Sequence, residues 1–156
     1  MNWEAIGAVG EIFGAGAVVL SLVYLGVQIR NQNREARAAA MHEIAEGFRD
    51  ILLPFLEPDF AKVFVRANED FDALLEAERV QIICACQRML RLWEEAYYQH
   101  AAGRFDERLW HSIVRQYAAY HSAASFTRAW ALRRDFYTED FRKFVDSVEK
   151  REFEIK

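Results

Sequence analysis

The stretch IFGAGAVVLSLVYLGVQI, from Ile12 to Ile29, holds eighteen residues and no charge. As a helix it would rise about 27 Å, close to the ~30 Å hydrocarbon core of a bilayer. Five of the seven glycines lie within the first 29 residues, where the only charged side chains are Glu4 and Glu11. Because glycine weakens helices in water but is frequent in membrane helices, we predict a transmembrane helix rather than a buried helix of a soluble protein.

The residues on either side of this stretch predict whether it is cleaved off and how it is oriented in the membrane. No Lys or Arg precedes it, so the positive n-region of a signal peptide is missing, although residues 15–17 imitate a cleavage site. Three arginines follow it directly, Arg30, Arg34 and Arg37. Because basic residues favour the cytoplasmic side, we expect residues 1–30 to form a retained transmembrane helix with its N-terminus outside, and residues 31–156 to form a cytoplasmic domain.

The composition of the chain predicts a folded domain. Hydrophobic residues make up 53% and charged residues 28% of the sequence, which provides enough apolar surface for a packed core. The net charge of -4 argues against binding to nucleic acid, which requires a local excess of Lys and Arg. We therefore expect no nucleic-acid partner.

Helical periodicity continues beyond Arg30 without a breaker as far as Pro54. The spacing of apolar residues predicts further helices over 60–67, 75–102 and 106–121, and a loop over 68–72. Gly103 is the expected stop signal and Asp106 the expected N-cap, and two shorter helices would be capped by Ser125 and Thr138. No segment alternates with period two, so the predicted class is all-α: one N-terminal transmembrane helix that continues into a cytoplasmic bundle of about five helices. The expected core consists of Phe48, Ile82, Met89, Trp93, Ile113, Tyr117, Trp130 and Phe144.

One face of the predicted membrane helix carries small and polar residues. At about 100° per residue they form a stripe made of Gly7, Gly10, Gly14, Ser21 and Gln28, with Glu11 at its edge. Val9, Val19, Leu20 and Val23 lie on the opposite, lipid-facing side. Gly10 and Gly14 form a GxxxG pair, which allows two helices to approach closely, so a second copy of the chain is the expected partner. Glu11 would bond across that interface, extend outward to the membrane surface, or line a pore.

The same N-terminal region carries a resemblance. The strings Trp3-Glu4-Ala5-Ile6-Gly7, Gly10-Glu11-Ile12, Ser21-Leu22-Val23-Tyr24-Leu25 and Gln28-Ile29-Arg30 look like those of a group of short uncharacterised bacterial proteins, and the similarity extends to Glu94, to residues 97–100 and to the helix around Trp110. The resemblance implies a bacterial inner-membrane protein with a helical cytoplasmic domain. It implies no reaction, ligand or catalytic residue.

Side chains that could carry chemistry form no recognisable catalytic or metal-binding pattern. The pairs His42 with Glu46 and Glu107 with His111, and the neighbourhood of Glu94, Glu95 and His100, lack the Glu-x-x-His repeat of di-iron bundles and the second histidine of a zincin. Cys84 and Cys86 would point about 200° apart on a helix, too far to bind one metal ion. We predict no catalytic residue, no metal site and no cofactor, and the sequence specifies no ligand.

These patterns support three hypotheses. The first is a non-enzymatic, self-associating, single-span membrane protein that acts as a scaffold or sensor. The second is a homo-oligomeric ion channel with Glu11 near the pore. The third is a small-molecule-binding or enzymatic helical domain that uses an aromatic pocket, although aromatic residues at helical spacing usually form core. The aromatic set is Trp93, Tyr97, Tyr98, Phe105, Trp110, Tyr117, Tyr120, Phe126 and Trp130.

Overall fold

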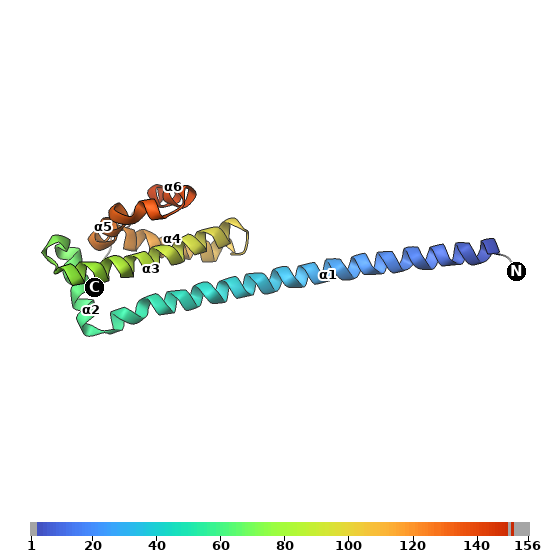
Figure 1. The fold of residues 1–156 in the computed structure, drawn as a ribbon, viewed down its shortest axis with the longest axis horizontal. Helices are drawn as coiled ribbons and strands as arrows, with labels where there is room; N and C mark the ends of the chain where they lie inside the picture. The colour runs from blue at the N-terminus through green and yellow to red at the C-terminus, as the bar shows by residue number, and fades with distance from the viewer. Residues whose placement is uncertain (1–2, 150, 152–156) are drawn as a thin grey trace. The chain divides into compact units, whose positions relative to one another are not determined.

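The computed structural model describes residues 3–149 and 151, and every regular element in this range is helical (Figure 1). The all-α class is therefore confirmed. The α-helices are α1 (Trp3–Leu52), α2 (Pro58–Glu69), α3 (Glu76–Ala101), α4 (Glu107–Ser122), α5 (Ala124–Arg133) and α6 (Glu139–Ser147). Short 3-10 turns occupy Leu53–Leu56, Phe71–Ala73 and Arg134–Phe136.

The chain divides into two compact units, Met1–Ala39 and Ala40–Lys156. The predicted boundary at residues 30 and 31 marks the end of the apolar run, whereas the second unit starts where α1 begins to bury side chains. Ala40, Ile44 and Ile51 are each less than a tenth exposed. The last three turns of α1 therefore belong to the helical domain.

The ends of the helices follow local sequence signals. Pro54 lies in the turn that follows α1, and Pro58 is the first residue of α2, where a missing backbone N–H costs nothing. Gly103 adopts a φ of 68°, which only glycine reaches without strain, and it follows the end of α3. The Asp106 carboxylate accepts a hydrogen bond from the Leu109 backbone N–H at 2.9 Å and caps α4. Both predicted signals, Gly103 and Asp106, are confirmed.

The predicted cap at Ser125 is wrong. Helix α5 begins two residues earlier than predicted, with Ala123 at the N-cap position, and Ser125 lies inside the helix and is fully buried. Its backbone N–H and its hydroxyl both donate to Asn68 Oδ1, at 3.1 and 2.9 Å. Asn68 was expected in a loop, but α2 continues to Glu69, and the Asn68 side chain ties α2 to α5.

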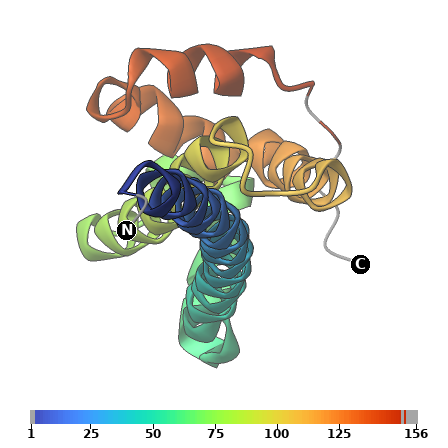
Figure 2. The same cartoon turned by 90° about the vertical axis from the view of Figure 1, so that its right-hand side faces the viewer.

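Helix α3 carries eight buried residues, and α5 packs against α2, α3 and α4. Both views place α5 and α6 on one side of α3 (Figure 1, Figure 2). Six of the eight predicted core residues are buried, whereas Phe48 and Phe144 are half-buried and pack against the core. Aromatic rings fill much of the interior, and the Trp93 and Tyr117 rings meet edge to face at 4.1 Å. Burial among these rings raises the pKa of the Tyr117 hydroxyl above its ordinary value.

Candidate functional site

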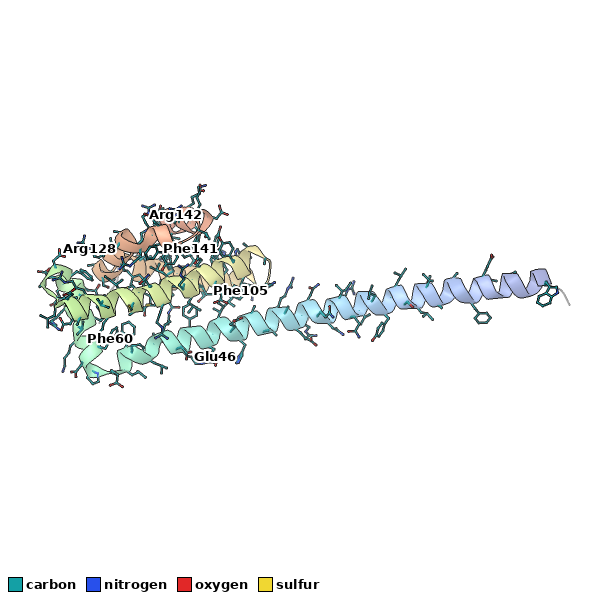
Figure 3. All side chains as sticks on the ribbon, in the orientation of Figure 1. Glu46, Phe60, Phe105, Arg128, Phe141 and Arg142 are labelled. Carbon is teal, nitrogen blue, oxygen red and sulfur yellow. The ribbon has the colours of Figure 1, made fainter. Side chains whose placement is uncertain are left out.

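The apolar part of α1 exposes its side chains on every side. Among the described residues, one helix is long and apolar enough to cross a membrane: an 18-residue window within Gly10–Leu56 has a mean hydropathy of 2.0, and none of that window is buried. Phe13 is 75% exposed and Leu20 is 72% exposed. Figure 3 shows the side chains of this stretch directed outward around the helix. This segment is a candidate surface for contact with lipid or with another helix.

The predicted stripe lies entirely on this exposed helix. A Cβ atom added at Gly7, Gly10 or Gly14 would meet nothing within 4 Å, so these glycines leave open space beside the backbone. The Ser21 hydroxyl donates back to the Ala17 carbonyl at 2.9 Å, and Gln28 Nε2 donates to the Tyr24 hydroxyl at 2.9 Å. The side chains of Ser21 and Gln28 therefore each make a hydrogen bond within their own helix.

Glu11 is exposed on the same helix, one residue before the uncharged run. Within the described part of the chain, its carboxylate has no hydrogen bond or ion pair. The structure thus brings all six predicted residues onto one exposed helix, and whether they pack against a second helix stays a prediction.

The aromatic set forms core rather than an open pocket. Trp93, Phe126 and Tyr117 are at most 2% exposed, whereas Tyr98 is 40% exposed. The space between Trp93, Trp110, Tyr117 and the side chains around them has no room for a water molecule. The rings of Trp93, Trp110 and Tyr117 lie within the packed interior, and the space between them does not admit a ligand.

Glu94 is a buried carboxylate that sequence reasoning placed in a possible metal neighbourhood. Its Oε1 accepts hydrogen bonds from the Thr138 backbone N–H at 3.1 Å and from the Thr138 hydroxyl at 3.2 Å. Its Oε2 accepts from Arg91 Nη1 at 2.6 Å, and Arg91 Nη2 donates to the Phe136 carbonyl. Glu94 and Arg91 therefore hold the start of α6 against α3. Thr138 occupies the predicted N-cap position, but its hydroxyl bonds to Glu94 instead of capping the helix.

The histidine and carboxylate pairs behave as local contacts. The His100 ring stacks on Trp110 at 4.4 Å, and His100 Nε2 lies 3.3 Å from Glu107 Oε1. His111 Nε2 is 3.9 Å from Glu107 Oε2. Among the described residues, no three His, Cys, Asp or Glu side chains gather closely enough to hold a metal ion.

An open groove of about 550 Å³ lies between the last turns of α1 and the middle of α3. Its charges are of both signs, from Asp50, Arg88, Arg91 and Glu95, and the exposed Cys84 lines it. Burial, and then the nearby carboxylate of Glu43, raise the pKa of Glu95. Sequence reasoning missed this groove because its walls come from segments about forty residues apart. The one sequence signal was the glycine at position 47. It lets α1 and α3 approach closely, because a Cβ there would come within 2.6 Å of Leu92 Cδ1.

Comparison of the chain with protein-family models, with curated protein sequences and with solved structures finds no match.

Proposed function

We propose that this chain is a single-span membrane protein of a bacterial inner membrane that self-associates through its glycine stripe and presents a helical domain to the cytoplasm as a non-enzymatic scaffold or sensor. One observation carries the proposal, the exposed apolar segment of α1. The bacterial setting follows from the resemblance of its N-terminal strings, and the orientation from the arginines after the span.

The exposed segment needs an apolar environment. Exposed apolar side chains run through residues 12–29, and each large one gains about 1.5–3 kcal/mol when it leaves water. Single exposed apolar residues are ordinary on soluble proteins, but a continuous apolar helix surface is typical of membrane or protein contact. The length of the run matches a bilayer core, which favours the membrane.

Self-association is the second part of the proposal. Helices in lipid have no hydrophobic force to drive them together, so they associate where small residues allow close packing. The glycines at positions 7, 10 and 14 leave such a surface open, and the neighbouring Ser21 and Gln28 already have hydrogen-bond partners. A second copy of the same stripe is the partner of matching shape.

Membrane anchoring can be tested by extraction of membranes with alkaline carbonate. The full chain should stay in the pellet, whereas the double variant Leu20→Arg with Val23→Arg should move to the supernatant, since each buried arginine opposes insertion. The matched control is Val65→Arg with Val80→Arg, which places the same charges at exposed positions of the domain and should stay in the pellet. Release of the unaltered chain would refute anchoring.

Orientation can be tested in intact cells with a membrane-impermeant maleimide. A cysteine introduced at Asn2, which lies outside the described residues, should react from outside. The native Cys84 is exposed on the domain and should react only after the membrane is permeabilised. The reverse pattern would place the domain outside.

A further inference from the structure

Three arginines follow the apolar segment of α1 on a single helix face. Arg30, Arg34 and Arg37 are all exposed, and spacings of four and three residues place their side chains within an arc of about 60°. Glu35, the acidic residue among them, points about 130° away from the centre of that arc. The face therefore presents three positive charges and no negative one.

These arginines differ from several arginines of the domain that lie in ion pairs. Arg128 pairs with Asp72, Arg134 with Asp146 and Arg142 with Asp135. Figure 3 labels Arg128 and Arg142 on the domain. By contrast, Arg30, Arg34 and Arg37 make no side-chain hydrogen bond or ion pair within the part of the chain that the structure describes. Their guanidinium groups are free to bind an anion.

The register of the helix directs this face toward lipid. Residues seven apart lie within about 20° of one another, so Val23 and Arg30 point to the same side. Gln28, on the glycine stripe, points about 200° from Arg30. A second copy that packs on the stripe would therefore leave the arginines uncovered and facing the surrounding lipid.

The depth of the arginines matches the headgroup layer. Arg30 comes directly after the uncharged run, and Arg34 lies about 6 Å further along the axis, within a headgroup layer about 5–8 Å thick. Arg37 lies about 10 Å beyond Arg30, but helical side chains lean toward the N-terminus, which brings its guanidinium back toward the membrane.

We propose that Arg30, Arg34 and Arg37 form a binding face for the phosphate groups of anionic phospholipids. The planar guanidinium group binds two phosphate oxygens at once, which a lysine ammonium cannot do. The proposal rests on the membrane anchoring described above, because only a chain inserted by the segment 12–29 holds these arginines at headgroup depth.

The experiment uses the full chain, reconstituted in vesicles of phosphatidylcholine and phosphatidylglycerol and then extracted in mild detergent. Mass spectrometry of the co-purified lipid should show phosphatidylglycerol enriched over its share in the vesicles. The triple variant Arg30→Gln, Arg34→Gln, Arg37→Gln should lose this enrichment. We expect each arginine removed to lower the affinity for the anionic lipid about fivefold.

A matched control removes three exposed, unpaired arginines from the domain, Arg49, Arg108 and Arg115, and should keep the enrichment. A triple change to lysine should retain part of it, because the charge remains and the two-pronged contact is lost. The lipid proposal is overturned if the glutamine variant and the unaltered chain show equal enrichment, or if neither shows any. In that case, anchoring still holds if both proteins stay in the vesicles after carbonate extraction. Release of the unaltered chain by carbonate overturns anchoring and this inference together.

Discussion

The glycine stripe allows a sharp test of self-association, because substitution there leaves the single chain undisturbed. A Cβ at Gly14 meets nothing within 4 Å, and the same is true at Gly16. The two positions lie about 200° apart around the helix, so Gly14 belongs to the stripe and Gly16 to the opposite side. Gly14→Ile and Gly16→Ile are therefore identical changes on opposite faces.

The expected cost of Gly14→Ile comes from lost contact between two helices. A bulky side chain forces the axes back to the ordinary 8–10 Å separation. If about ten close carbon contacts are lost, each contributing about 0.1–0.2 kcal/mol, association weakens by about 1–2 kcal/mol, or about 5- to 30-fold. Gly16→Ile should leave association unchanged.

Energy transfer between donor- and acceptor-labelled chains, measured across a series of protein-to-lipid ratios in vesicles, gives the association constant for each variant. The midpoint of the series should move to higher protein density for Gly14→Ile only. Equal midpoints for the two variants would refute the stripe as the interface, and absence of energy transfer in the unaltered chain at every density would refute self-association.

Three further predictions concern the helical domain, each measured by urea unfolding of the full chain in detergent. Trp93→Ala should lower the free energy of unfolding by about 3–5 kcal/mol, because the ring is 2% exposed, whereas Trp3→Ala, at a position 72% exposed, should change nothing; equal effects would contradict the core assignment. Burial raises the pKa of the Cys86 thiol from 9.0 to about 12, so the folded state keeps a proton that the unfolded state loses, and stability present below about pH 9 should fall by about 1.4 kcal/mol per pH unit from there toward pH 12. Cys86→Ala should make that slope shallower by about 1.4 kcal/mol per pH unit, the contribution of one proton. An unchanged slope would show that the Cys86 thiol does not cause the loss of stability. Glu94→Ala should cost about 2–3 kcal/mol, because the Thr138 backbone N–H and Arg91 lose a charged acceptor, and Glu94→Gln should cost about 1 kcal/mol because one acceptor oxygen remains; the opposite order would contradict the role of Glu94.

Most of the helix plan follows from the sequence alone. Proline, glycine and aspartate act on the backbone within a few residues of themselves, so Pro54, Gly103 and Asp106 mark ends of helices without reference to the rest of the chain. The apolar run from Ile12 to Ile29 is equally local, since its length and lack of charge are properties of one segment. The six stripe residues share a helix face for the same reason.

Only the tertiary structure decided what the polar side chains of the domain do. Ser125 has the chemistry of a helix cap, but its hydroxyl bonds to Asn68, which is 57 residues away in the chain. Glu94 and Thr138 lie 44 residues apart and meet because α3 and the start of α6 lie side by side. A local rule cannot anticipate such a partner, because the competition between a nearby backbone group and a distant side chain is settled only when the helices pack.

The groove and the burial of the last turns of α1 also depend on how the helices pack. The spacing of Ile44, Phe48 and Ile51 identifies an apolar face from sequence, but not the surface that covers it, and the fold buries Ile44 and Ile51 within the domain itself. Gly47 is a single glycine among charged residues, and the sequence does not say what lies beside it. Packing gives it a separate role, because Leu92 fills the space where a Cβ would lie, whereas the glycines before Arg30 face open space that a second helix can use.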